Sequence, residues 1–240
     1  MSHTIHFEVL DAPEAVAQKA AEAIAAEARA AAAARGRFVM AVSGGRTPWL
    51  MLRALANMEL PWSAVQFVQV DERVAPEGSA ERNLTHLRES LLGNAPLAPQ
   101  QILEMPVEPD NLEAAAMQYA ATLRRVAGSL PVLDLVHLGL GTDGHTASLI
   151  PGDPVLAIAN ADVAVTGEYQ GRRRMTLTFP IINRSRRILW VVTGAEKSVV
   201  LDRLLRGDDA IPAGRISREK ALLIADEAAA KKAVEHLAQN

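Results

Sequence analysis

The chain has 240 residues, of which 49% are hydrophobic and 22% charged, so it is long enough for one large domain with a full hydrophobic core. Its net charge of −3 excludes the basic surface that binds nucleic acid or an anionic membrane, and the absence of cysteine excludes disulfides and thiol nucleophiles and fits a reducing compartment. No apolar run reaches the roughly 18 residues of a membrane span, and the first residues lack the pattern of a signal peptide, so we expect a cytoplasmic protein.

The N-terminal region predicts a strand followed by a long helix. Residues Ile5–Leu10 alternate as a strand does. Asp11 is placed to cap an alanine-rich helix, which has Pro13 near its start and ends near Gly36. Charged residues and isoleucine recur at helical spacing among the alanines, which indicates a packed helix.

A second strand, Phe38–Val42, leads directly into the sequence SGGRTP at residues 43–48. We expect Thr47 as the N-cap and Pro48 as the first residue of the next helix. A strand, a glycine turn and a helix start place free backbone N–H groups where an anion can bind, so the segment indicates phosphate binding. A tight turn that needs glycine only for its backbone angles explains the same sequence equally well. The segment is not a nucleotide P-loop, because no Gly-Lys-Ser/Thr follows.

A third strand, Val65–Val70, ends in the charged run Asp71-Glu72-Arg73. Charged side chains at the end of a strand are often solvated, and we expect this of at least one of the three. The pattern that follows predicts helices around Asn83–Leu92 and Asn111–Val126, with a short strand at Ile102–Met105 between them.

The most informative stretch is LDLVHLGLGTDGHTASLIPG, residues 133–152. Leu133–Leu138 is typical of a buried central strand, and the glycine-rich loop after it carries Asp143 and His145. A carboxylate beside a histidine can fix its tautomer and raise its basicity, so the two residues form a candidate general-base pair. For an isolated Asp-x-His motif, a structural histidine beside a capping aspartate is the commoner explanation, and the surrounding glycines shift the balance toward a site. His137, inside the strand, is expected to be a core residue or to support the site from behind.

The same loop formally matches the dinucleotide fingerprint G-x-G-x-x-G. That fingerprint also requires a helix that opens at its glycines. Here Pro151, Gly152 and Pro154 leave room for little more than a turn, so we do not expect a nicotinamide cofactor.

The remainder of the chain continues the alternation of strands and helices. Two strands are predicted at Val163–Thr166 and Met175–Thr178, and a third at Ile188–Thr193. The turn and helix at Gly194–Leu205 carry Lys197 in the first turn, and a strand at Ala221–Ala225 precedes a final helix to Asn240. This order predicts an α/β fold, a three-layer αβα arrangement with a mainly parallel sheet, in a single domain over residues 1–240.

Several motifs together resemble the 6-phosphogluconolactonase family. They are GLGTDGHTASLIPG, SGGRTP, VDERVAP, RRMTLTFPIINRSRRILWVVTG and AEKSVVLDRLL, and the similarity extends from about residue 5 to residue 235. The resemblance implies a fold shared with glucosamine-6-phosphate deaminases. It also implies hydrolysis of 6-phospho-D-glucono-1,5-lactone to 6-phosphogluconate, in the oxidative pentose phosphate pathway, without a metal or a cofactor.

The resemblance also implies which residues form the site. The base is placed at His145 and its partner at Asp143. Contacts to the phosphorylated sugar lactone are placed at Ser43, Gly44, Gly45, Arg46, Thr47, Asp71, Arg73, Gly141, Thr142, Arg174 and Lys197. Without the resemblance, we would interpret Lys197 as an exposed helix lysine and residues 172–174 as a solvated arginine run.

The sequence departs from the family pattern in two places. Arg82 stands before Asn83 where these lactonases more often have serine, which puts a substrate role for Asn83 in doubt. Ile150 stands where phenylalanine is usual, which changes packing more than chemistry.

Two other functions remain open at this point. One is a sugar-phosphate isomerase or deaminase of the same fold, although those enzymes continue with Asn-Glu after the histidine loop, where this chain has Ser148, Leu149 and Ile150. The other is a non-catalytic regulator that binds a sugar phosphate. No pair of histidines has the spacing of metal ligands, and we predict no metal site. We expect a monomer or a weak homodimer.

Overall fold

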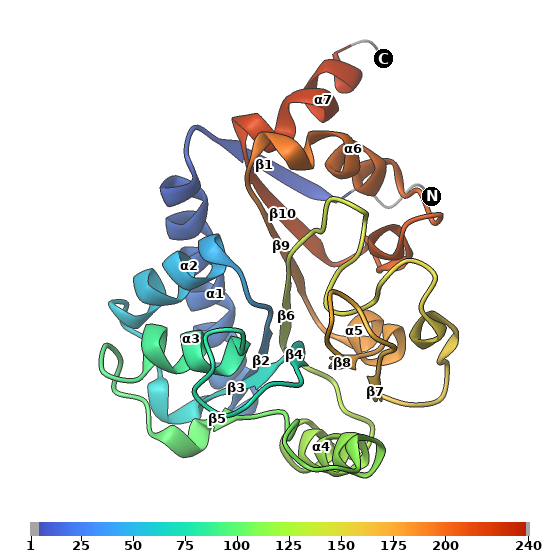
Figure 1. The fold of residues 1–240 in the computed structure, drawn as a ribbon. Coiled ribbons are helices and arrows are strands. Elements are labelled where there is room, and N and C mark those ends of the chain that lie inside the picture. Colours follow the sequence, from blue (N-terminus) through green and yellow to red (C-terminus); the bar gives the residue numbers. More distant parts are fainter. Residues whose placement is uncertain (1–4, 239–240) are drawn as a thin grey trace.

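A central sheet of seven parallel strands organises the chain in the computed structural model, which describes residues 5–238. The strand order is β1-β10-β9-β6-β2-β3-β5 (Figure 1). The strands are β1 (His6–Leu10), β2 (Phe38–Val42), β3 (Val65–Gln69), β5 (Ile102–Leu103), β6 (Leu135–Leu138), β9 (Ile188–Val192) and β10 (Ala221–Asp226). Among the described residues, no helix is both long enough and apolar enough to cross a bilayer.

Helices cover both faces of this sheet. One face packs against α1 (Pro13–Arg35), α2 (Arg46–Ala56) and α3 (Asn83–Leu91), and the other against α4 (Leu112–Ala127), α5 (Phe179–Arg184), α6 (Ser198–Arg206) and α7 (Glu227–Leu237). The alternation of side chains along β2 shows why both faces of the sheet must be covered. Phe38 and Met40 point into the core beneath α1, whereas Val39 and Ala41 point into the opposite core. The predicted three-layer αβα fold with a mainly parallel sheet is confirmed.

A second, smaller sheet lies over one side of the first (Figure 1). Its three antiparallel strands have the order β4 (Asp71–Arg73), β8 (Arg174–Leu177) and β7 (Val163–Val165). The register pairs Asp71 with Thr176 and Arg73 with Arg174. The charged run after β3 is therefore a strand rather than a solvated strand end: both carboxylates are buried and Arg73 is half-buried.

Two predicted helix starts were wrong. Ala12, not Asp11, is the N-cap of α1, and no side chain caps that helix, because Asp11 lies one residue too early. Helix α2 begins at Arg46 rather than at Pro48, since its N-cap is Gly45 with φ of 134°, a backbone angle that favours glycine over all other residues. The final helix ends at Leu237, and the predicted end at Asn240 lies outside the described residues.

Other differences are small or concern elements that the sequence did not predict. Helix α5 was not predicted, because its six residues lie between two strands and include a proline. Lys197 ends a 3₁₀ turn, Ala195–Lys197, and α6 begins at the next residue. The remaining predicted strands and helices agree with the structure to within one to three residues.

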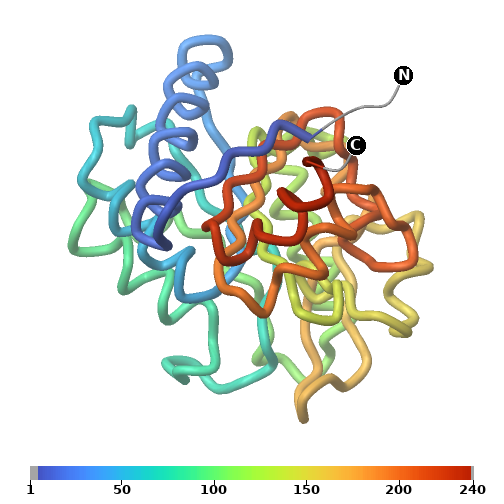
Figure 2. The backbone as a smooth tube through the Cα atoms, turned by 90° about the horizontal axis from the view of Figure 1, so that it is seen from above, coloured from blue at the N-terminus to red at the C-terminus, as the bar shows by residue number. Residues whose placement is uncertain are grey.

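The order in which the chain adds strands to the sheet reverses between β2 and β6. From β2 the chain proceeds to β3 on one side, and from β6 it proceeds to β9 on the other. Figure 2 shows the blue and cyan N-terminal helices on one side of the molecule and the orange and red C-terminal segments on the other. In open α/β sheets, the loops that leave such a point diverge and form a crevice at the carboxyl ends of the strands. The fold therefore places a site between the loops that follow β2 and β6.

Candidate active site

A cavity of about 900 Å³ opens at this point of the sheet. Its walls come from the loops after β2, β6 and β9, from β4, from the start of α3 and from the turn between β7 and β8. All of the predicted site residues except Asp143 line it: Ser43, Gly44, Gly45, Arg46, Thr47, Asp71, Arg73, Gly141, Thr142, His145, Arg174 and Lys197. The structure thus brings together residues from five separate stretches of the sequence.

The loop after β2 presents the start of α2 to the cavity. The first N–H of this helix to bond a backbone carbonyl is that of Trp49, which donates to Gly45 at 3.1 Å. The N–H groups of Arg46 and Thr47 precede it and have no partner within the helix, so they are available to an anion, and the helix dipole favours negative charge there. Gly44 lets the Asn83 side chain pack directly against this loop, because a Cβ at position 44 would lie 2.1 Å from Oδ1 of Asn83.

The loop after β6 holds the predicted pair. Nδ1 of His145 lies 2.6 Å from Oδ1 of Asp143, and the backbone N–H of His145 donates to the same oxygen at 3.1 Å. Partial burial raises the pKa of Asp143, but the backbone hydrogen bond and the nearby imidazole outweigh it and hold that pKa below its ordinary value. In the tautomer that carries its proton on Nδ1, His145 donates to this carboxylate and keeps its lone pair on Nε2. The direct contact that sequence spacing could not guarantee is present.

Glycine shapes this loop around the pair. A Cβ at Gly141 would lie 2.1 Å from Nδ1 of His145 and 2.7 Å from Oδ1 of Asp143. Gly144 has φ of 87° and packs against Ile211. The loop is closed by two backbone bonds, from the Gly141 N–H to the His145 carbonyl and from the Gly144 N–H to the Gly141 carbonyl. Gly141 is therefore required for the His145–Asp143 contact, and Gly144 allows the backbone angle with which the loop turns.

Four cationic side chains line the cavity: Arg46, Arg73, Arg174 and Lys197. Within residues 5–238, none of them forms an ion pair with a carboxylate. Arg174 is buried, and this burial lowers its pKa although the charge of Asp71 opposes the shift. Its guanidinium donates to Oε1 of Gln170, while its Nε has no partner in the described part of the chain. The cavity lining also includes the carboxylates Glu14, Asp71, Glu196 and Asp226, but none of the four cations is in direct contact with one of them.

The interpretation of residues 172–174 as a solvated arginine run holds for two of the three. Arg172 and Arg173 pair at the surface with Glu81 and Glu113. Arg174, the first residue of β8, instead lines the cavity, where it pairs in register with the cavity residue Arg73 of β4.

Asp71 is the buried carboxylate of the cavity wall. It accepts a hydrogen bond of 2.6 Å from the hydroxyl of Ser148, and burial raises its pKa above the usual value in spite of Ser148 and the nearby Arg174 and Arg73. Asn83, whose role was in doubt, also lines the cavity: its Nδ2 donates to the Asp71 carbonyl at 3.0 Å, and its Oδ1 accepts from Arg73 at 3.3 Å.

Tyr169 and Gln170 are cavity residues that the sequence did not reveal. The hydroxyl of Tyr169 donates to Oδ2 of Asp143 at 3.3 Å, its ring meets the His145 ring edge-on at 5.9 Å, and the Arg174 guanidinium lies 5.0 Å from its centroid. Both residues lie in a tight turn between β7 and β8, in which Gln170 and Gly171 have positive φ. Nothing in the sequence marks this turn, because its proximity to His145 arises only from the second sheet.

His137 supports the loop after β2 from below. It is fully buried, its Nδ1 accepts the backbone N–H of Ser43 at 3.3 Å, and burial lowers its pKa to about 3. This is the supporting position that the sequence predicted for it. Among residues 5–238, no cluster of three or more His, Cys, Asp or Glu side chains could hold a metal ion.

The chain was also compared with known proteins. The family model for glucosamine-6-phosphate isomerases and 6-phosphogluconolactonase matches residues 11–224. The 6-phosphogluconolactonase of Rattus norvegicus is 35% identical over 207 residues, which cover 81% of this chain and 80% of the rat protein. The solved 6-phosphogluconolactonase of Trypanosoma cruzi superposes with a TM-score of 0.85 at 26% identity and covers 96% of this chain and 97% of its own. A monomeric glucosamine-6-phosphate deaminase, with a TM-score of 0.82 and 18% identity over 95% of this chain and all of its own, shares the fold.

Proposed function

Because the chain belongs to the family of glucosamine-6-phosphate isomerases and 6-phosphogluconolactonases, we propose that its cavity hydrolyses 6-phospho-D-glucono-1,5-lactone with His145 as the general base. The chain is an enzyme, a lactone hydrolase of the oxidative pentose phosphate pathway, and its substrate is a small phosphorylated sugar lactone. The observation that carries the mechanism is the 2.6 Å contact between His145 and Asp143 at the wall of a cation-rich cavity. The cysteine-free composition fits a reducing compartment, and we propose that the reaction takes place in the cytoplasm.

The first chemical step is the attack of water on the lactone carbonyl carbon. Nε2 of His145 removes a proton from this water as its oxygen bonds to C1, and Asp143 stabilises the imidazolium that forms. A lactone is an activated ester, so no stronger nucleophile is needed. Asp143 also fixes the orientation of the ring, because it bonds both Nδ1 and the backbone N–H of His145.

The tetrahedral intermediate carries its negative charge on the former carbonyl oxygen. The N–H groups of Gly141 and Gly144 are bonded within the loop, whereas that of Thr142 has no partner among residues 5–238. We assign Thr142 as the loop's donor to this oxyanion, a contact worth about 3 kcal/mol in comparable sites. When the bond between C1 and the ring oxygen breaks, the imidazolium returns its proton to that oxygen, which becomes the C5 hydroxyl. The new carboxylic acid then ionises to 6-phosphogluconate.

The phosphate dianion is bound by cations and by free helix N–H groups in this proposal. Arg73, Arg174 and Lys197 supply the charge, and the start of α2 at Arg46 and Thr47 supplies backbone donors. This division of roles explains why the cavity contains cations without carboxylate partners.

The residues after the histidine favour the hydrolase over a deaminase of the same fold. The deaminases that resemble this chain carry an Asn-Glu there. In this structure Ser148 donates to Asp71, while Leu149 and Ile150 are buried in the apolar core. The loop therefore supplies no second carboxylate for proton transfer on an open-chain amino sugar.

The test is hydrolysis of freshly generated 6-phosphogluconolactone at mildly acidic pH, where spontaneous opening is slow. The wild-type protein is expected to accelerate the reaction, and His145→Ala should lower kcat by roughly 10²–10⁴-fold with little change in KM. An unchanged kcat would remove His145 from the mechanism. No acceleration by the wild type, with activity on glucosamine 6-phosphate instead, would establish the deaminase. Binding of 6-phosphogluconate without either activity would indicate the non-catalytic regulator.

A further inference from the structure

Glu72 is a fully buried carboxylate that the proposed mechanism does not use. It lies on β4 between Asp71 and Arg73, both of which line the cavity. Successive side chains of a strand point to opposite faces, so Glu72 points away from the cavity and into the protein. An ionisable group in such a place requires partners, since an unpaired buried charge is strongly unfavourable.

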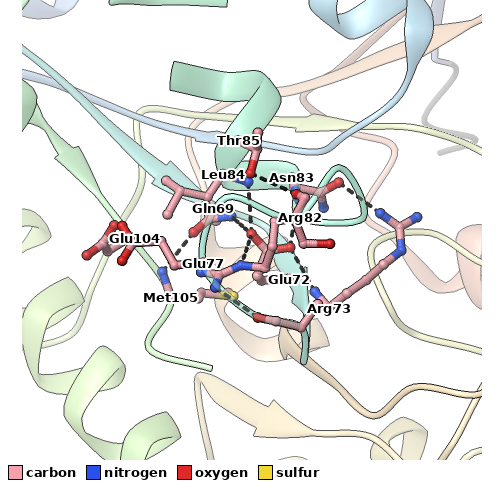
Figure 3. Close-up of polar contacts among 12 residues, drawn as sticks. Gln69, Glu72, Arg73, Glu77, Arg82, Asn83, Leu84, Thr85, Glu104 and Met105 are labelled. Atoms are coloured by element: carbon pink, nitrogen blue, oxygen red, sulfur yellow. Dashed lines mark hydrogen bonds and ion pairs between the residues drawn. The ribbon is translucent and has the colours of Figure 1, made fainter. Parts of the chain in front are cut away.

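The carboxylate of Glu72 accepts four N–H groups, each at 2.8 Å (Figure 3). Oε1 accepts the backbone N–H groups of Arg73 and Asn83, and Oε2 accepts the backbone N–H of Leu84 and the side-chain amide of Gln69. Asn83 and Leu84 are the first two residues of α3, and no side chain caps this helix from the preceding residue. Glu72 therefore caps α3 from a strand 11 residues earlier in the chain, and its charge also matches the helix dipole.

Arg82 compensates the buried charge. This residue is 1% exposed, its Nε lies 3.2 Å from Oε2 of Glu72, and its Nη1 contacts both Glu108 and the carbonyl of Ala75. Burial alone would lower the pKa of Arg82, but the bonds to Glu108 and Glu72 raise it above the usual value. The arginine that stands where the related lactonases more often have serine thus forms a buried ionic chain behind the site.

The groups that Glu72 holds are in direct contact with cavity residues. Asn83 donates to the Asp71 carbonyl and accepts from the Arg73 guanidinium, and its Oδ1 packs so closely on Gly44 that no Cβ would fit there. A shift at the start of α3 would therefore move Asn83, and with it the Arg73 guanidinium and the glycine loop after β2.

We propose that Glu72 is a positioning residue for binding of the anionic substrate: by capping α3 it holds Asn83 and Arg73 in the arrangement that binds the phosphorylated sugar. This inference rests on the proposed function, because it concerns the same cavity. It differs from a purely structural role, in which loss of Glu72 would lower stability and leave the affinity of the folded protein unchanged.

The test compares Glu72→Gln with Glu108→Gln in the full-length protein, and measures the Kd of 6-phosphogluconate by calorimetry together with kcat and KM. The amide of Glu72→Gln has one acceptor oxygen, so at least one set of N–H groups loses its partner. We expect the Kd and KM to rise roughly 10-fold or more, with kcat within about threefold, because a small displacement of binding groups is costly. The Glu108 side chain is 51% exposed and pairs with Arg82, the residue before α3, so Glu108→Gln should change the Kd less than about twofold.

A double-mutant cycle separates positioning from general destabilisation. In an Asn83→Ala background, Glu72→Gln should change the Kd by less than about threefold, because the two residues act through one contact. Equal effects of Glu72→Gln in both backgrounds, or a folded Glu72→Gln protein with the wild-type Kd, would overturn the proposal. Glu72→Asp, which keeps the charge that Arg82 requires, replaces Glu72→Gln in the cycle if the latter does not fold. If the wild type itself does not bind 6-phosphogluconate, the proposed function fails instead.

Discussion

Gly141→Ala is the substitution that most directly tests whether the His145–Asp143 contact is the catalytic arrangement. The Cβ of alanine would lie 2.1 Å from Nδ1 of His145 and 2.7 Å from Oδ1 of Asp143. The backbone of Gly141 is not in the left-handed region, so alanine itself introduces no conformational strain there. The effect of the substitution is therefore confined to the two side chains that it contacts.

The expected loss follows from the displacement. Ordinary carbon contacts lie near 3.5 Å, so the imidazole would have to move by more than about 1 Å, and it cannot do so without lengthening its bond to Asp143. A misplacement of this size typically costs about 10²-fold in rate, which corresponds to about 2.7 kcal/mol of activation free energy. We expect kcat for lactone hydrolysis to fall by about that factor, with KM changed less than about threefold, because the phosphate-binding cations are on other elements.

The matched control is Gly139→Ala in the same loop. A Cβ at Gly139 meets no atom within 4 Å, and its φ is not positive, so its kcat should remain within about twofold of the wild type. Melting curves of both variants show whether they are folded. Wild-type kcat in Gly141→Ala would refute the reasoning, since the base would then not depend on the geometry seen here.

Two further predictions address binding and stability. Lys197→Ala should raise KM by about 10-fold or more and leave kcat nearly unchanged in steady-state assays, because Lys197 supplies charge to the phosphate and lies on a separate turn from His145; a loss confined to kcat would contradict this role. Burial lowers the pKa of His137 to about 3, against about 6.5 in an unfolded chain, so the unfolded state gains a proton first and this residue's contribution to stability is lost as pH falls from about 6.5 toward 3. His137→Asn keeps an acceptor for the Ser43 N–H but does not titrate. Between pH 6 and pH 4 its free energy of unfolding, measured with urea, should therefore fall by about 1 kcal/mol less per pH unit than that of the wild type. Equal slopes for the two proteins would show that His137 is not the group responsible.

The central sheet and the His145 loop could be predicted because their signals are local. A run such as Leu133–Leu138 is apolar on both faces, as a covered parallel strand must be, and the glycines that follow it mark where the strand ends. The order of strands and helices then determines the fold class. The resemblance to the family supplied the other cavity residues, and the fold brings most of them together because the carboxyl ends of β2, β3, β6 and β9 meet at one edge.

The second sheet could not be predicted in the same way. The run of Asp71, Glu72 and Arg73 reads as a solvated strand end, because three charged residues give no periodic signal of burial. Its pairing with β8 joins segments about a hundred residues apart, and only that pairing brings the turn at Tyr169 beside His145. The helix starts at Ala12 and Gly45 were displaced for a different reason: a cap is chosen by backbone angles, and several residues nearby had suitable side chains.

The pairing of β4 with β8 also explains why the cavity is suited to a dianion. The antiparallel register sets Arg73 directly opposite Arg174, and like charges in such a pair are destabilising. Burial adds to the cost and lowers the pKa of Arg174, although the charge of the nearby Asp71 opposes this shift. Two facing arginines beside the single carboxylate of Asp71 leave positive charge at this wall that the carboxylate alone does not balance. In the proposed function a phosphate dianion bound between them would neutralise this positive charge, so the unfavourable pair in the sheet would contribute to substrate affinity.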